Sequence, residues 1–290
     1  MDLSGRVVKR VRRTSGENEW VLFIQQDLVA TLQVWRDICY RLLNPANGAV
    51  HALPERLAEE HANMDIRQRD YSTVIIFGLV ASTGEYKVLR VLDCISYREQ
   101  LCEVFTLDGS NSSRWRGKKA PPGRLEMRQS GVVINGIVYL FSAPRRIASF
   151  DLETEEWRAT LQGPQINLVG DAARMLNNQM AALSGSLVVV HYHHPSMDLW
   201  FLIDLEKQLW VKQHSINVNL SVMHPVKLNI CPLLVLNDGR IVTYIDIGTR
   251  GLLRIYNPRT STYTDVAEIG TRDGIGLYTG NLLSSANGAN

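Results

Sequence analysis

The chain has 290 residues and a formal net charge of +2, with 45% hydrophobic and 21% charged residues. This composition excludes wholesale disorder, and the length suffices for one large or two ordinary domains. The near-zero charge gives no argument for nucleic acid or an anionic membrane as partner, and no apolar run approaches the ~18 residues of a membrane span. Without a secretory signal or a paired cysteine motif, we expect a soluble protein of a reducing compartment, in the cytoplasm, the nucleus or both.

One turn pattern recurs along the chain. A strand-like segment is followed by Asn or Asp, and a large or β-branched residue comes six positions later. The pairs are Asn44 and Val50, Asp151 and Trp157, Asp204 and Trp210, and Asn257 and Tyr263, with a looser copy from Asp108 to Trp115. An Asx side chain bonds backbone N–H groups just ahead of it and opens a turn. The pattern therefore predicts repeated β-hairpins.

A second turn precedes three of these hairpins. Asn135-Gly136, Ser184-Gly185 and Asp238-Gly239 each separate two apolar, β-branched runs, which is a strong hairpin signal. Strand, tight turn, strand, loop, strand, Asx turn and strand thus form a four-stranded unit that occurs at least three times. An earlier unit is predicted over residues 72–115.

The Asx turns recur at roughly the 40–50-residue period of four-stranded propeller blades, with some long connections. Helical solenoids and doubly wound α/β folds need amphipathic helices that the sequence largely lacks, whereas a large β-sandwich remains an alternative. We predict an all-β protein, a β-propeller of five or six four-stranded blades, complete or incomplete.

Ordered landmarks resemble a known family. Residues 40–48 with Leu53-Pro54 come first, followed by residues 83–90, residues 102–107 with Trp115-Arg116, and Asn135-Gly136. This series is similar to the plant F-box-associated (F-box protein interaction) β-propeller domain, over residues 40–283. The resemblance implies a propeller that binds a protein substrate, attached to an F-box that docks onto a Skp-type adaptor of a cullin ubiquitin ligase.

Residues 1–39 depart from that pattern, because they lack the Leu-Pro opening and the Cys-Lys-x-Trp ending of an F-box. We therefore expect an N-terminal segment without adaptor docking, a propeller over 40–283 and a flexible tail over 284–290. The chain is then a non-catalytic interaction domain, or a truncated family member without ligase coupling.

A propeller enzyme, such as a kelch-type oxidase or a glycosidase, is the alternative from another class. We identify no catalytic, cofactor-binding or metal-binding residues. His191, His193 and His194 could suggest a metal, but no acidic or cysteine cluster completes a site. Histidines at a hairpin tip are the simpler interpretation, and Trp115, Trp157, Trp200 and Trp210 are expected to pack between blades.

The basic residues suggest a binding face. Alternate turns of a meander lie on opposite faces of a propeller, so connections and middle loops share one face. The basic residues assigned to that face are Arg116, Lys118, Lys119, Arg124, Arg128, Arg145, Arg146 and Arg250. We hypothesise that they bind an acidic segment of a protein partner, with dispersed, solvated charges as the alternative. Glu153, Glu155 and Glu156 are expected to be solvated on the opposite face.

Overall fold

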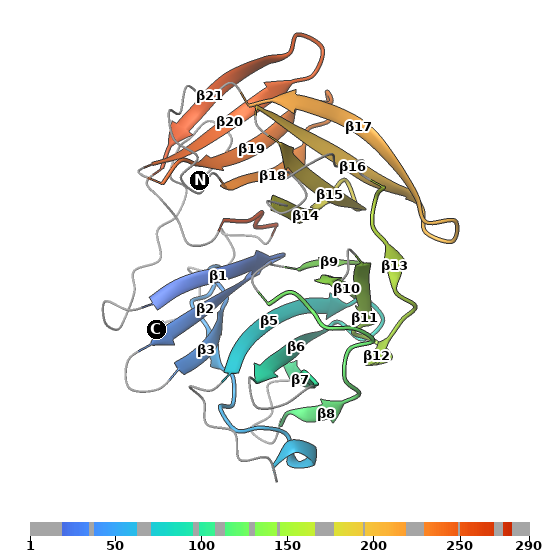
Figure 1. The fold of residues 1–290 in the computed structure, drawn as a ribbon. Helices are drawn as coiled ribbons and strands as arrows, with labels where there is room; N and C mark the ends of the chain where they lie inside the picture. The colour runs from blue at the N-terminus through green and yellow to red at the C-terminus, as the bar shows by residue number, and fades with distance from the viewer. Residues whose placement is uncertain are drawn as a thin grey trace, which may run out of the picture.

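A computed structural model describes residues 19–34, 38–62, 71–94, 99–107, 114–127, 131–143, 146–165, 177–193, 195–218, 229–248, 250–269 and 275–279. In these residues the chain forms five blades of four antiparallel strands, arranged in a ring (Figure 1). A short 3-10 helix, η1 (Glu59–His61), is the one helical element there. The predicted all-β propeller is confirmed, and its blade number is five.

Each blade uses four strands that are consecutive in sequence. Blade 1 contains β1 (Glu19–Gln25), β2 (Leu28–Val34), β3 (Ile38–Leu43) and β4 (Val50–Ala52). Blade 2 contains β5 (Tyr71–Val80), β6 (Glu85–Cys94), β7 (Leu101–Leu107) and β8 (Arg116–Lys118). Blade 3 contains β9 (Val132–Ile134), β10 (Ile137–Ser142), β11 (Arg146–Asp151) and β12 (Glu156–Trp157), and β13 (Leu161–Gln162) also pairs with β11.

Blades 4 and 5 complete the ring. Blade 4 contains β14 (Asn177–Leu183), β15 (Ser186–His193), β16 (Ser196–Asp204) and β17 (Leu209–Asn217). Blade 5 contains β18 (Asn229–Val235), β19 (Ile241–Asp246), β20 (Gly251–Asn257) and β21 (Thr262–Glu268). Blade 1 begins at β1, so the propeller starts before residue 40, where the sequence analysis placed its first residue. The expected tail at 284–290 lies outside the described residues.

The turns form for the predicted reason. In four blades an Asn or Asp side chain accepts a backbone N–H two or three residues ahead, at 2.8–3.0 Å; these residues are Asn44, Asp151, Asp204 and Asn257. Four positions after each Asx residue the backbone is left-handed, at Gly48, Glu155, Gln208 and Ser261. The Asn135-Gly136 and Ser184-Gly185 turns are left-handed at both central residues, with φ of 50° at Asn135 and 76° at Gly136, which matches the twist of a hairpin; in the Asp238-Gly239 turn, Gly239 alone is left-handed.

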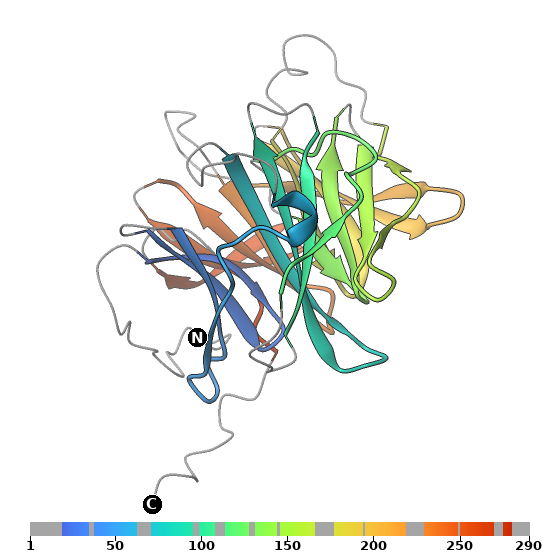
Figure 2. The same cartoon turned by 90° about the horizontal axis from the view of Figure 1, so that it is seen from below.

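Alternating side chains of each blade enter the cores on its two sides. On β10, Val138 and Leu140 pack toward blade 2, whereas Ile137, Tyr139 and Phe141 pack toward blade 4. This period of two explains why the inner strands are nearly continuous apolar runs: both of their faces are buried. Figure 2 shows the strands running between two faces of the ring, with tight turns such as β5–β6 on the lower face in that view.

The seam between blades 5 and 1 is closed by residues 275–279. The innermost strands pack in the order β1, β5, β9, β14 and β18, and the C-terminal segment lies between the two ends of this series (red in Figure 1). Tyr278 bridges Gln26 in the β1–β2 turn, and the Thr279 N–H donates to the Gln26 carbonyl at 2.8 Å. Gly276 packs so closely on Ile24 that a Cβ there would lie 2.8 Å from the Ile24 Cβ.

Replacing Gly276 tests this closure. G276V should lower the free energy of unfolding by about 1–3 kcal/mol, because the new side chain overpacks against β1. L277A, at the adjacent exposed position, should cost less than about 0.5 kcal/mol. Urea unfolding of both variants measures the difference, and equal stabilities would show that the segment does not hold the ring closed.

Candidate functional site

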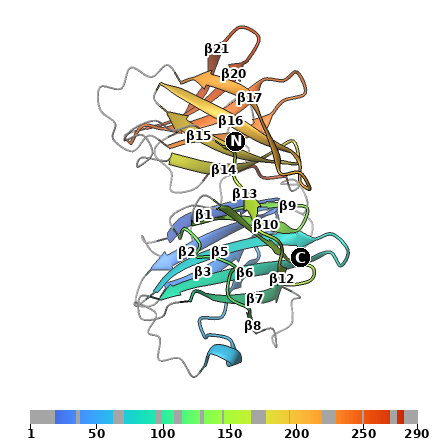
Figure 3. The same ribbon diagram turned by 45° about the vertical axis from the view of Figure 1, so that its right-hand side comes forward.

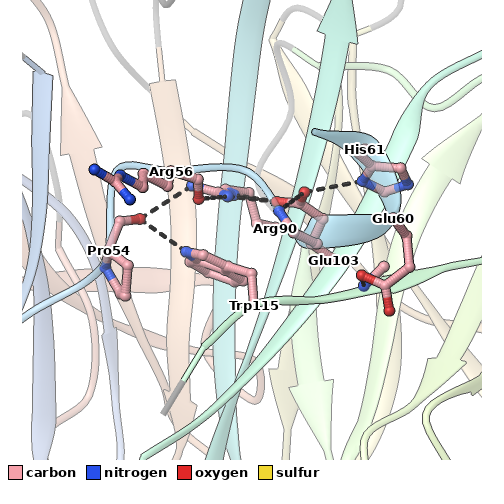
Figure 4. Close-up of polar contacts among 9 residues, drawn as sticks. Pro54, Arg56, Glu60, His61, Arg90, Glu103 and Trp115 are labelled. Atoms are coloured by element: carbon pink, nitrogen blue, oxygen red, sulfur yellow. Dashed lines mark hydrogen bonds and ion pairs between the residues drawn. The ribbon is translucent and has the colours of Figure 1, made fainter. Parts of the chain in front are cut away.

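A buried ion pair organises blade 2. Arg90 on β6 and Glu103 on β7 are register partners, and both side chains are almost fully buried. The Arg90 Nε–H donates to Glu103 Oε2 at 2.7 Å, and Nη2 contacts the same oxygen. The other carboxylate oxygen accepts the Ala58 N–H at 2.8 Å and lies 2.9 Å from His61 Nδ1 (Figure 4). Both oxygens are thus partnered, as a buried carboxylate requires.

The same network anchors the connection from blade 1 to blade 2. Arg90 donates to the Pro54 and Arg56 carbonyls, at 3.3 and 2.9 Å, and the Trp115 indole N–H also donates to Pro54, at 2.7 Å. The guanidinium lies 3.9 Å from the centre of the Trp115 ring. Pro54, Arg90, Glu103 and Trp115, all within the landmarks of the sequence, therefore meet in one structural contact (Figure 4).

The indole contact recurs in the next two blades. The Trp157 Nε1–H donates to the Lys119 carbonyl at 3.0 Å, and the Trp210 Nε1–H donates to the Gln162 carbonyl at 2.9 Å. In each case a tryptophan near the outer edge of one blade bonds the chain leaving the preceding blade; for Trp210 this is β13, which lies between blades 3 and 4 (Figures 1 and 3). Trp200 packs against the core shared by the same two blades. The expected interblade role of all four tryptophans agrees with these contacts.

A second ionic cluster joins blades 2 and 3. The Glu155 carboxylate lies 2.9 Å from Lys87 Nζ and 2.6 Å from Lys118 Nζ, and it also contacts the Arg116 guanidinium. Its side chain is only 12% exposed, so the expectation that Glu155 is solvated was wrong. Arg116 and Lys118 lie on β8 rather than in the connection that follows, because strand pairing with β7 continues to Lys118.

The remaining basic residues fall into three groups. Arg124 pairs with Asp93, and Arg250 pairs with Glu268. Lys119 and Arg146 are exposed and make no ion pair within the part of the chain that the structure describes. Arg128 and Arg145 lie outside the described residues. The Ala143 N–H donates to the Arg124 carbonyl, so Arg124 and Arg146 flank the same β10–β11 loop.

His191 and His193 contact other polar side chains of blade 4. His191 Nδ1 lies 2.9 Å from Asn178 Oδ1, and His193 Nε2 lies 3.3 Å from Asp198, which Lys212 also contacts. Burial lowers the pKa of His191, and the neighbouring His193 lowers it further. No group of three or more His, Cys, Asp or Glu residues that could hold a metal ion occurs among the described residues. His194 lies outside them.

Lys87, like Arg90 and Glu103, is a charged residue that sequence reasoning did not identify. It lies within a landmark of the sequence, but its carboxylate partner Glu155 belongs to another blade. The two residues are far apart in sequence, so no local pattern predicts that they pair. The pair follows only from the contact between the β11–β12 turn and the preceding blade.

An apolar surface lies on the β16–β17 hairpin, which extends outward from blade 4 (Figure 1). Its exposed large apolar side chains are Ile203, Leu205, Leu209 and Val211, each 41–52% exposed. Exposed apolar side chains that gather on one element are typical of interaction sites. Among the described residues, no helix is long and apolar enough to span a membrane.

Removing the buried carboxylate tests the blade 2 network. E103Q should lower the free energy of unfolding by about 3–5 kcal/mol, because it leaves Arg90 buried without its counter-charge. E59Q is the matched control, since the Arg114–Glu59 pair is exposed, and it should cost less than about 0.5 kcal/mol. Chemical denaturation of the two variants checks this; similar losses would refute the assigned role of Arg90 and Glu103.

Acid should weaken the Glu155 cluster. Burial raises the pKa of Glu155, but hydrogen bonds from Arg116, Lys118 and Lys87 outweigh it and lower the pKa from 4.5 to about 2. Because the folded-state pKa is depressed, the stabilisation is present above pH 4.5 and is lost as the pH falls toward 2. E155Q should therefore cost about 2–4 kcal/mol at pH 7 and much less near pH 2.5. Thermal unfolding against pH measures this, with E153Q in the same turn as control; a pH-independent difference would contradict it.

The chain was compared with curated proteins and with solved structures. No curated protein matches the chain. Among solved structures, one described as a structural and mechanistic analysis of two prolyl endopeptidases is 13% identical, with a TM-score of 0.48, over 88% of this chain and 36% of that one. An exo-β-1,3-galactanase from Phanerochaete chrysosporium, solved with β-1,3-galactotriose, is 12% identical, with a TM-score of 0.43, over 86% of this chain and 66% of that one.

At these identities and scores the two likenesses carry no argument about function, and this chain spans only part of each neighbour.

The family comparison is of a different kind, because it covers nearly the whole propeller. The sequence model for the F-box associated beta propeller domain matches residues 7–277, from before β1 to the segment that closes the ring. The chain belongs to the F-box associated beta propeller domain family.

Proposed function

We propose that this chain is a non-catalytic protein-interaction module, the substrate-recognition part of an SCF-type ubiquitin ligase. The observation that carries the proposal is membership of the F-box-associated family over residues 7–277. Two features of the molecule support it. The buried charged contacts around Glu103 and Glu155 join structural elements to one another, and the β16–β17 hairpin exposes four large apolar side chains.

The basic surface favours an acidic segment of a protein substrate as the partner. Arg124 and Arg146 flank the β10–β11 loop, Lys119 lies in the connection that leaves blade 2, and Lys119 and Arg146 make no ion pair among the described residues. Such charges raise the association rate with an acidic partner more than they raise affinity. Arg128 and Arg145 adjoin this surface in sequence and belong to the same proposal.

The link to the ligase is a separate part of the proposal. The β1 and β2 strands use residues 19–34 to build blade 1, so these residues serve the propeller rather than an adaptor contact. We propose that the propeller binds substrate and that the Skp-type adaptor does not bind the described propeller directly.

Charge reversal tests the substrate surface. The K119E/R146E variant should capture its partner from plant cell extract at least about fivefold less than the unmodified chain, because two attractive charges become repulsive. K207E/R240E carries the same change in charge on turns at the opposite face and should leave capture unchanged. Quantitative mass spectrometry of the captured proteins is the measurement, with circular dichroism to verify folding.

Each outcome bears on one part of the proposal. Equal capture by both double variants would refute the basic surface. Saturable binding of a purified Skp-type adaptor to the chain would refute the absence of direct docking. Turnover of a sugar or peptide substrate by the purified chain would overturn the non-catalytic module itself.

A further inference from the structure

The Glu155 cluster contains more positive charge than its structural role requires. Lys87, Arg116 and Lys118 converge on one carboxylate, which is the only carboxylate in ion-pair contact with them among the described residues. Glu60 lies near Lys118, but its carboxylate is exposed and accepts the Gly117 N–H at 3.1 Å. Glu85 and Glu153, which are close in sequence to the cluster, form no ion pair with the three cations in the described structure.

The corresponding turn of blade 4 contacts the preceding blade through a neutral side chain. Gln208 has the same left-handed position as Glu155, four residues after the Asx residue. Its neutral side chain reaches back to blade 3 through one hydrogen bond, from the Gln162 N–H at 2.7 Å. One polar contact therefore suffices to join two blades at this position, and the additional cations around Glu155 exceed that requirement.

We propose that Arg116 and Lys118, supported by Lys87, form an oxyanion-binding site at the junction of blades 2 and 3. The side chains of Arg116 and Lys118 are 38% and 25% exposed. The Lys87 side chain is only 11% exposed and contacts Glu155 from the buried side of the cluster. An ammonium has three N–H donors and a guanidinium has five. Glu155 takes one contact from Lys118, and Arg116 directs Nε and Nη2 to Glu155 and Thr106. Donors of both cations thus remain for an oxyanion at the surface.

The ligand chemistry follows from these donors. A phosphate or carboxylate oxyanion accepts charge-assisted hydrogen bonds from guanidinium and ammonium groups. The site lies at the turn end of the blades, since Glu155 belongs to the β11–β12 turn, and Arg146 lies at the opposite end of β11. Lys118 adjoins Lys119 of the basic surface proposed for the substrate, but the phosphate titration tests the oxyanion site separately, so it does not depend on that proposal. The oxyanion comes either from a free phosphate or from a phosphorylated or acidic residue of a protein.

Titration with inorganic phosphate at constant ionic strength tests the site. We expect saturable binding to the unmodified chain by calorimetry, and about tenfold weaker binding to R116Q and to K118Q, because each loses one charge-assisted contact. E155Q should bind phosphate about tenfold more tightly, since the competing carboxylate is gone. K207Q, in the corresponding turn region of blade 4, is the control and should bind like the unmodified chain.

The E155Q result separates a binding site from a purely structural cluster, which would lose stability without gaining affinity for phosphate. A phosphoserine peptide, its unphosphorylated form and a Glu-containing form distinguish the source of the oxyanion. Binding of either charged peptide more tightly than phosphate identifies a protein segment, and binding of phosphate alone identifies a free ion. Absence of saturable phosphate binding, or equal binding by K118Q and K207Q, overturns the site.

Discussion

The orientation of blades 2, 3 and 4 depends on a hydrogen bond from an indole N–H to a backbone carbonyl of the chain leaving the preceding blade. Apolar burial between blades supplies most of the attraction, but it is not directional and does not fix how one sheet lies on the next. Trp115, Trp157 and Trp210 each add a directional contact, to Pro54, Lys119 and Gln162. The Pro54 and Lys119 carbonyls lie in connections outside the sheets, so there the same bond orients a blade and fastens a loop, whereas Gln162 lies in β13, which also pairs with β11.

Several charged residues within the landmarks of the sequence make structural contacts. Arg90 and Glu103 hold the connection that enters blade 2, and Lys87 with Glu155 joins blade 2 to blade 3. A buried charge must be paired, so these residues are constrained by the fold before any partner is considered. Lys119 and Arg146 form no ion pair among the described residues and are not constrained in this way.

The repeated turns made the fold predictable from sequence, because an Asx side chain and a left-handed glycine act within a few residues. Blade 1 was only partly predicted for the same reason: its first turn contains Gln26 in a left-handed conformation (φ 54°), without glycine or asparagine. The candidate site was less predictable. The basic residues were identified, but whether Arg116 pairs with Glu155 depends on which blades are neighbours, and that information is not local in the sequence.

The closing segment has a consequence for folding kinetics. Each blade is a meander of consecutive strands, so its contacts are short-range and form without waiting for distant parts of the chain. The contacts of Gly276 and Thr279 with β1 and its turn join opposite ends of the described chain. Their loop-closure entropy is large because they are far apart in sequence, although this cost grows only logarithmically with loop length. During synthesis the five blades can therefore assemble in order, and the ring becomes a closed, cooperative unit only after the last of these residues leaves the ribosome.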